Sequence, residues 1–281
     1  MSAISWFGAF YTAMVYDSKQ SFHRRGLVSF VAYNCLNPIF SLLSAWVAYT
    51  ILQSVGATYF RGITGIASYM TFATIGLAFN GIIHQSAFGG FSAVRFEQWQ
   101  GTLEPVIRTP ASNHAWLFGK LVVGELFGFI PLISTLLFGA AIFGFQLASA
   151  PALGAAALAI VMMLVSMSVV SFVFGSVSVF VKDPTDAAIL VTSFLGFFSG
   201  LVFPVSVLPP QVQWFSWILP STYGVDVARK ALLLGMGLGD WQVQYELMVM
   251  LAITLILLPI SYLAFSRAVR MAERSGALDT G

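Results

Sequence analysis

The sequence predicts an all-α integral membrane protein, and three observations support this fold class. The 281-residue chain is 58% hydrophobic and only 9% charged, with a mean hydropathy of +0.86, whereas soluble globular proteins carry about 25% charged residues. Several apolar runs approach or exceed the roughly 20 residues that a helix needs to cross the hydrocarbon core. Lysine and arginine are unevenly distributed among the segments between these runs, as expected for a multi-pass topology.

Residues 1–25 are predicted to form an amphipathic helix along the cytoplasmic membrane interface. Trp6, Phe10 and Met14 recur at helical spacing, and polar residues follow at Asp17 and Lys19. Because the basic residues come after the apolar part, the segment has the reverse order of a cleavable signal peptide and we expect it to be retained. An unstructured tail is the alternative, which the aromatic content disfavours.

Six membrane spans are expected in a single transmembrane domain that covers residues 1–281. They lie at about 27–53, 63–87, 117–145, 153–181, 187–203 and 243–265. The fifth is the shortest and ends at "FPVSVLPP", where prolines should stop the helix. With both termini in the cytoplasm, ten of the 13 lysines and arginines lie on the cytoplasmic side, and only Arg61, Arg229 and Lys230 lie outside.

A seventh span over 211–235 is the competing interpretation. It would place Asp226, Arg229 and Lys230 in the hydrocarbon, at a cost of about 2.5–3.5 kcal/mol each. Residues 204–242 are therefore expected to form an external structured loop. In this loop Trp214 and Trp217 suit the membrane interface, and Ser221 is the expected N-cap of a short helix that runs through Val225, Ala228 and Leu232.

The loop at 92–112 is a polar segment between two long apolar runs. Glu97, Gln100, Gly101 and Glu104 share one face if the segment is helical, and two prolines, Pro105 and Pro110, are expected to close that helix. The pattern indicates a short acidic-faced helix in the cytoplasm. Such a helix is a docking surface for a partner, unless it is only a solvated linker between two spans.

Three stretches resemble the type 2 ABC exporter permeases. "RFEQWQGTLEPVIRTPAS" is similar to the family's first cytoplasmic loop. "SFLGFFSGLVFPVSVLPPQVQWFSWILPSTYGVDVARKAL" (193–232) resembles its fifth span and external re-entrant segment, and "KDPTDAAIL" (182–190) matches its second cytoplasmic turn less specifically. The specific motifs occupy about a fifth of the chain, although the shared topology covers nearly all of it.

The resemblance implies a permease subunit that pairs with a second copy or a paralogue. Each permease would recruit a separate ABC ATPase subunit, two in all, and ATP and Mg would bind to those partners and not to this chain. The implied ATPase-coupling residues are Glu97, Gln100, Gly101, Thr102 and Glu104 in a coupling helix, with Asp183 as a lesser contact in the second turn. Capping of the following helix is an equally good interpretation of Asp183.

The chain has no sequence feature of a catalytic or metal site of its own. The Gly119–Lys120 pair lacks the upstream glycine and the following hydroxyl of a phosphate-binding loop, so we do not expect an enzyme, and Lys120 is interpreted as a residue that snorkels to the interface. Cys35 is the single cysteine, and the three histidines have no metal-ligand spacing, so we expect no metal site. The net charge of +2 argues against a nucleic-acid partner.

Two ionisable residues within the predicted spans are candidate functional groups. Glu125 lies in the third span and His84 lies at a similar depth in the second, so we expect the two to hydrogen-bond across neighbouring helices. Alternatively, Glu125 faces a vestibule open to the cytoplasm or pairs with a basic residue at the membrane edge.

The family resemblance also implies a substrate path lined by the second and fifth spans. The second span offers Phe72, Phe79 and Asn80, and the fifth span offers Phe194, Phe197 and Phe198. Many aromatic and few charged groups would suit a drug-like or lipid-like solute, although phenylalanine is also an ordinary lipid-facing residue.

Three function classes follow from these patterns. The leading one is the membrane subunit of an ATP-driven exporter in a prokaryotic inner (plasma) membrane, with polysaccharide or lipid-linked glycan export as the alternative to a drug-like or lipid-like substrate. An ion-coupled secondary carrier would need more ionisable groups near the midplane and often internal repeats. A membrane scaffold without transport activity would leave the polar loop unexplained.

Overall fold

The computed structural model describes residues 3–25, 27–66, 68–109, 112–144, 150–181 and 184–275, and every regular element in these ranges is helical. The elements are α1 (Ala3–Arg25), α2 (Leu27–Thr64), α3 (Tyr69–Gln100), α4 (Leu103–Arg108), α5 (Asn113–Phe127), α6 (Phe129–Phe143), α7 (Ala150–Ser178), α8 (Pro184–Phe198), the 3-10 helix η1 (Val205–Val207), α9 (Pro210–Ile218), α10 (Pro220–Leu234) and α11 (Trp241–Ser275). The all-α prediction is therefore confirmed for the part of the chain that the structure describes.

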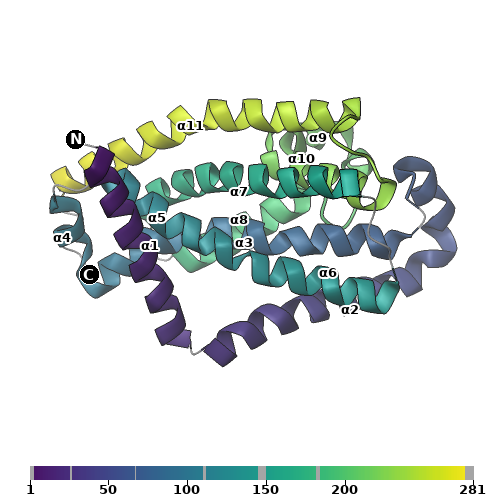
Figure 1. Cartoon of the computed structure of the whole chain (residues 1–281), viewed down its shortest axis with the longest axis horizontal. Helices are drawn as coiled ribbons and strands as arrows, with labels where there is room; N and C mark the ends of the chain where they lie inside the picture. The colour runs from purple at the N-terminus through teal and green to yellow at the C-terminus, as the bar shows by residue number, and fades with distance from the viewer. Residues whose placement is uncertain are drawn as a thin grey trace.

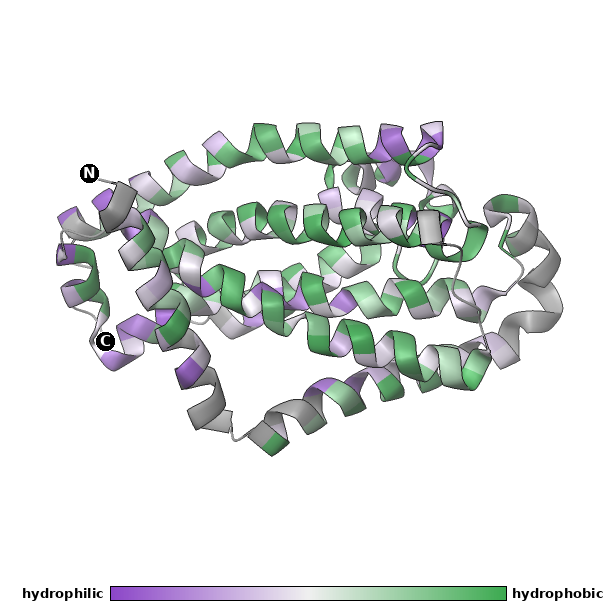
Figure 2. Cartoon of the chain, in the orientation of Figure 1, coloured by the Kyte–Doolittle hydropathy of each residue, from purple (hydrophilic) through white to green (hydrophobic). Residues whose placement is uncertain are grey.

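The long helices form an elongated bundle (Figure 1). Helices α3, α6, α7 and α11 run along its long axis, while α4 and the C-terminal part of α11 lie at one end and α10 lies towards the other. Hydrophobic residues dominate the middle of these helices, and hydrophilic residues gather around α4 and at the start of α11 (Figure 2). This distribution suits a bundle whose two ends face water and whose middle lies in hydrocarbon.

Three described helical stretches are long and apolar enough to cross a membrane. They are Asn113–Phe143, which comprises α5 and α6, Ala152–Ser178 in α7 and Trp241–Ala272 in α11, and they match the predicted third, fourth and sixth spans. The stretch at Thr185–Phe198 is apolar but shorter. Helix α2, with 38 residues, contains the predicted first span and continues beyond it. The predicted second span at 63–87 begins too early, because residues 63 and 64 end α2, and α3, with 32 residues, begins at Tyr69 and continues to Gln100.

Helix α3 lies at the centre of the bundle. It packs against α2, α5, α6, α7, α8 and α10, and Phe79, Ile82 and Ile83 on it are completely buried. The main hydrophobic core joins these residues to α7, α10 and the N-terminal part of α11. A second core joins α3, α4, α5 and α11 at the opposite end. Displacement of α3 would thus affect both cores.

Helix α1 crosses one end of the bundle at a steep angle to the long helices (Figure 1). Trp6 and Phe10 stack with ring centroids 5.7 Å apart, and Phe10 lies 5.7 Å from Phe118 of α5. Phe7 and Tyr11 on α1 are about two-thirds exposed. The predicted helix at 1–25 is confirmed, and its aromatic residues divide between a face that packs on α5 and an exposed apolar face.

The region after the fifth predicted span differs from expectation at two points. Helix α8 ends at Phe198 and is followed by Gly200 with φ of +68°, so a left-handed glycine ends this helix several residues before Pro204. Leu219, not Ser221, is the N-cap of α10, because Pro220 takes the first helical position. The expected short helix is confirmed, and the apolar face that includes Val225 is buried.

Candidate functional site

The polar loop forms a sharp elbow between α3 and α4. Helix α3 ends at Gln100, and Gly101 adopts φ of +67°, a conformation that glycine reaches without steric cost. The amide of Thr102 then donates to Glu97 O at 2.9 Å, and α4 begins at Leu103. The prediction of one continuous helix through these residues is wrong, because the left-handed glycine turns the chain.

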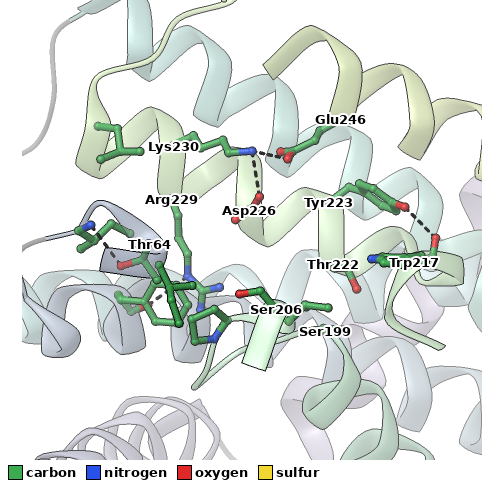
Figure 3. A pocket seen from close by; sticks show the side chains of 16 residues that line it. Thr64, Ser199, Ser206, Trp217, Thr222, Tyr223, Asp226, Arg229, Lys230 and Glu246 are labelled. Atoms are coloured by element: carbon green, nitrogen blue, oxygen red, sulfur yellow. Dashed lines mark hydrogen bonds and ion pairs between the residues drawn. The ribbon is translucent and has the colours of Figure 1, made fainter. Parts of the chain in front are cut away.

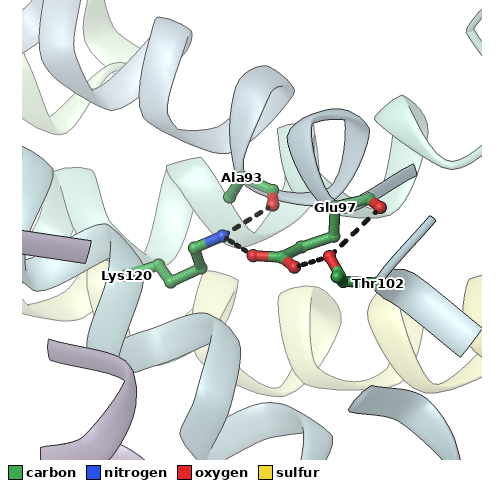
Figure 4. Close-up of polar contacts among 4 residues, drawn as sticks. All are labelled: Ala93, Glu97, Thr102 and Lys120. Atoms are coloured by element: carbon green, nitrogen blue, oxygen red, sulfur yellow. Dashed lines mark hydrogen bonds and ion pairs between the residues drawn. The ribbon is translucent and has the colours of Figure 1, made fainter. Parts of the chain in front are cut away.

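Two buried anchors hold this elbow on the bundle. Leu103 is 1% exposed and belongs to the core that joins α3, α5 and α11. The Glu97 carboxylate is 3% exposed and forms an ion pair with Lys120 of α5, 2.5 Å from Oε1 to Nζ. Lys120 also donates to Ala93 O at 3.3 Å, and the Thr102 hydroxyl donates to Glu97 Oε2 (Figure 4). Displacement of α4 would therefore be passed directly to α3 and α5.

The exposed face of the elbow keeps Gln100, Gly101 and Glu104 from the predicted face but lacks Glu97. Glu97 points into the protein, so it does not share an outward acidic face with Gln100, Gly101 and Glu104. Lys120 is buried in an ion pair and is not a snorkelling residue. Glu104 is one-third exposed and pairs with Arg108 at 2.5 Å, which makes the surface close to neutral. Pro105 lies in the first turn of α4 and does not end it. Pro110 and Asp183 lie outside the described residues.

Trp99 adds a large apolar group to the same exposed surface. It is 63% exposed on the last turn of α3, and the Arg95 guanidinium lies 5.7 Å from the centre of its ring. Gln100, Gly101 and Pro105 are also exposed. We define the elbow surface as Trp99, Gln100, Gly101, Glu104, Pro105 and Arg108. Its combination of one aromatic anchor and one ion pair is typical of a protein–protein contact.

A second polar site lies at the other end of the bundle, where Arg229 of α10 is buried. Its guanidinium donates to Leu201 O at 2.6 Å, to Gly200 O at 2.9 Å and to Phe72 O at 3.3 Å, and it lies 3.5 Å above the centre of the Phe72 ring. Carbonyls just beyond the C-terminus of a helix carry partial negative charge and stabilise a cation. Arg229 therefore joins α10, the segment after α8 and the start of α3.

Burial lowers the pKa of Arg229 to about 9, and the negative charge of Asp226 opposes this decrease. The guanidinium remains protonated at neutral pH. Gly76 of α3 makes this contact possible, because an added Cβ would lie 1.8 Å from Leu201 O and 2.3 Å from Arg229 Nη2. The sequence predicted only that Arg229 lies in an external loop. Its burial could have been predicted from its position four residues after Val225, because this spacing places it on the apolar face of the short helix.

A cavity of about 330 Å³ adjoins Arg229 at the end of the bundle away from the elbow, and we call it the outer cavity (Figure 3). Lys230 on its wall lies 3.0 Å from Asp226 Oδ2 and also forms an ion pair with Glu246 of α11. The Tyr223 hydroxyl donates to Trp217 O at 2.9 Å. The cavity has the size of a small-molecule site, and its charges are largely paired within the chain.

A family model described as ABC-2 type transporter matches residues 7–233, which include the elbow, α8 and nearly all of α10. The chain belongs to the ABC-2 type transporter family. The resemblance drawn from the loop motifs is thereby confirmed. A search of curated proteins finds no match. The ABC-2 membrane domain is a transport component and not a catalytic domain, and this family normally works with ABC ATPases. The protein is thus a membrane-embedded permease.

Within this ABC-2 permease the predicted path residues fall into two groups. Phe79 is completely buried and Phe72 is 3% exposed beneath Arg229, so the prediction that these two line an open path is wrong. Phe194 and Phe197 on α8 are 40% and 50% exposed, and Phe198 packs between Phe194 and Phe215. Asn80 is partly exposed on α3. The exposed group remains available to a path along α8.

The two intramembrane ionisable residues of the permease do not form the expected pair. Ser86 of α3 donates to Glu125 Oε1, and Ser171 of α7 lies 3.4 Å from the same oxygen. His84 instead stacks on Phe88, with ring centroids 4.2 Å apart. Glu125 is 3% exposed where α3, α5 and α7 meet, so the alternative of an open vestibule is also wrong. We interpret this carboxyl as a structural group that links α5 to α3 and α7 through the two serines.

Proposed function

We propose that this chain is the membrane-spanning subunit of an ATP-driven exporter in a prokaryotic inner membrane, and that the elbow surface docks on its ATPase. The proposed topology has six spans with both termini in the cytoplasm, α1 along the membrane interface and 204–242 as an external re-entrant segment. Two such permeases, as copies or paralogues, would recruit two ATPase subunits that bind ATP and Mg.

The observation that carries this proposal is the mechanical connection of the elbow. Leu103 and the Glu97–Lys120 ion pair attach α4 to α3 and α5, and α3 contacts most of the other long helices. A partner that closes against the elbow surface would therefore move packed helices as rigid units, which is how switching transitions spread through proteins. A solvated linker would not need two buried anchors.

The proposed substrate is a drug-like or lipid-like molecule that moves along α3 and α8. Phe194 and Phe197 give α8 an exposed aromatic face, which suits an apolar solute. A polysaccharide or lipid-linked glycan is the alternative cargo. An ion-coupled carrier receives less support, because the carboxyl of Glu125 lies enclosed by three packed helices.

The docking proposal is tested by co-purification in detergent with tagged ABC ATPases of the source cell, each co-expressed with the chain. We expect one ATPase to co-purify with the native chain. Glu104→Arg, which places like charges at residues 104 and 108, should weaken this binding roughly tenfold. Trp99→Ala should weaken it by at least as much, because exposed aromatic anchors dominate such interfaces.

Matched controls lie on α1, at the same end of the bundle. Lys19→Glu reverses an exposed charge and Phe7→Ala removes an exposed aromatic ring. Both should retain the ATPase. Equal losses in the elbow and control variants would contradict docking through the elbow, and absence of any ATPase with the native chain would contradict the exporter itself. Glu97→Arg is unsuitable as a docking probe, because this residue is buried.

A further inference from the structure

A small cavity lies beside the middle of α3, between α2 and α6, and is separate from the elbow and the outer cavity. Its volume is about 70 Å³. Its polar lining comes from six side chains: Asn34, Asn37, Ser41, Asn80, His84 and Gln85. Apart from His84, no residue that lines the cavity is ionisable. The cavity is therefore a concentration of amide groups with no formal carboxylate or ammonium charge.

The spacing of these residues explains why they meet. Asn34, Asn37 and Ser41 recur every three or four residues and share one face of α2. Other positions of α2 at this level are exposed and apolar, including Leu36 at 51% and Phe40 at 67%. Helix α3 supplies Asn80 and His84 at a four-residue spacing. Both helices thus direct polar residues towards one space, and Asn37 lines this space while it is itself exposed beside the apolar residues Leu36 and Phe40.

The cavity lies at the depth where polar groups are most costly. His84 is 12 residues from Phe72, which contacts Arg229, and 13 residues from Glu97 at the elbow. At 1.5 Å per residue, this places it roughly 20 Å from each end of α3. Polar residues in the middle of membrane helices are rare and mark substrate pathways. A cluster of amides at this depth therefore indicates a ligand.

Hydrogen-bonding capacity identifies the ligand class. The side chains of Asn37, Asn80 and Gln85 form no hydrogen bond with another described residue. An amide offers both donors and an acceptor, which matches hydroxyl groups, because these also donate and accept. A charged headgroup would find no formal countercharge among the lining amides. The volume has room for about two water-sized groups, so the site would hold the hydroxyls of a larger molecule.

We propose that this amide cavity binds the neutral, hydroxyl-rich part of the transported molecule, such as a sugar. The proposal rests on the proposed transport function and names the headgroup of its cargo. Asn80 also borders α8, because its Oδ1 lies 3.6 Å from the position of a Cβ at Gly196. A molecule held by its hydroxyls here would have its apolar part beside Phe194 and Phe197.

Binding of radiolabelled octyl β-glucoside to the full chain in lipid nanodiscs tests this assignment. We expect saturable binding that falls roughly tenfold in Asn37→Leu/Asn80→Leu, because two hydrogen bonds are lost. Gln211→Leu, which removes an exposed amide on α9, should bind normally. Octyl phosphocholine, which has the same chain and a charged headgroup, should not compete. Competition by free glucose would identify a soluble sugar as the source, and its absence would identify an amphiphile.

Cysteine protection gives a second measurement that does not depend on the leucine variants. In a Cys35→Ser background, octyl β-glucoside should slow maleimide labelling of Leu77→Cys, which lines the cavity without supplying an amide, and leave Ile133→Cys, an exposed position on α6, unaffected. Unchanged glucoside binding in the leucine variants, equal binding of octyl phosphocholine, or no protection at position 77 would overturn the site. Because these assays contain no ATPase, a failure of docking through the elbow would leave their result unaffected.

Discussion

Two buried cations of this permease are stabilised in different ways. Lys120, beneath the elbow, pairs with the carboxylate of Glu97 from a neighbouring helix, whereas Arg229, beside the outer cavity, donates only to backbone carbonyls. The first arrangement depends on two side chains, so either one left alone is a buried unpaired charge. The second depends on one forked side chain and on backbone atoms that no substitution removes.

The largest effect is expected at the elbow ion pair. Lys120→Met leaves the Glu97 carboxylate buried without its cation, which costs about 3–5 kcal/mol. We expect the thermal midpoint in detergent to fall by about 10 °C. Glu97→Gln/Lys120→Met, which removes both charges, should recover most of this loss. A double variant as unstable as the sum of the two single variants would show that the residues do not interact as a pair.

A methyl group added at Gly76 tests the close approach of α3 to the Arg229 contact. Gly76→Ala places a Cβ against Leu201 O, a backbone atom that cannot move easily, and should cost about 3 kcal/mol. Gly124→Ala on α5 is the matched control, because nothing lies within 4 Å of its added Cβ. The control should be neutral or stabilising by about 0.5–1 kcal/mol. Denaturant unfolding of both variants measures the contrast.

The variant Arg229→Lys distinguishes the contribution of the carbonyl contacts of Arg229 from the contribution of its charge. Lysine keeps the charge but has one nitrogen, which cannot reproduce a fork that reaches three carbonyls. We expect a loss of about 2 kcal/mol, and faster proteolysis between α8 and α10, because this residue joins them. Lys230→Arg is the control at the neighbouring position. A fully stable Arg229→Lys would mean that charge alone holds the segment.

The smallest effect on stability is expected at the exposed ion pair of the elbow. Glu104→Gln/Arg108→Gln removes a pair with one member 77% exposed, and such pairs contribute less than about 1 kcal/mol. The thermal midpoint should hardly change while ATPase binding weakens. Loss of stability equal to that of Lys120→Met would contradict the distinction between a buried anchor and an exposed docking contact.

Patterns along the chain were sufficient for several features of the fold. Apolar runs indicated a helical membrane protein, the periodicity of Val225, Ala228 and Leu232 predicted α10, and the polar residues at 97–104 marked the elbow. The loop motifs also predicted the family. These properties depend on neighbours in sequence, so local spacing and composition determine them.

Side-chain directions at the sites could not be predicted in the same way. Glutamate is ordinarily a surface residue, and nothing in the sequence connects Glu97 to Lys120, 23 residues away. Phe72 and Phe79 resembled path residues because a phenylalanine can face lipid, a ligand or a core equally well. The pairing of Glu125 with serines instead of His84 depended on how α7 packs against α3.

Hydrophobicity, helical period and motif spacing are local properties, and they were enough to identify a helical ABC-2 permease with a polar segment at 97–104. Which charges are buried and which amides converge depends on contacts between helices, and the sequence alone did not reveal them. A buried cation needs carbonyl or carboxylate partners, and those partners come from helices distant in sequence whose rotation and crossing are set by packing around α3.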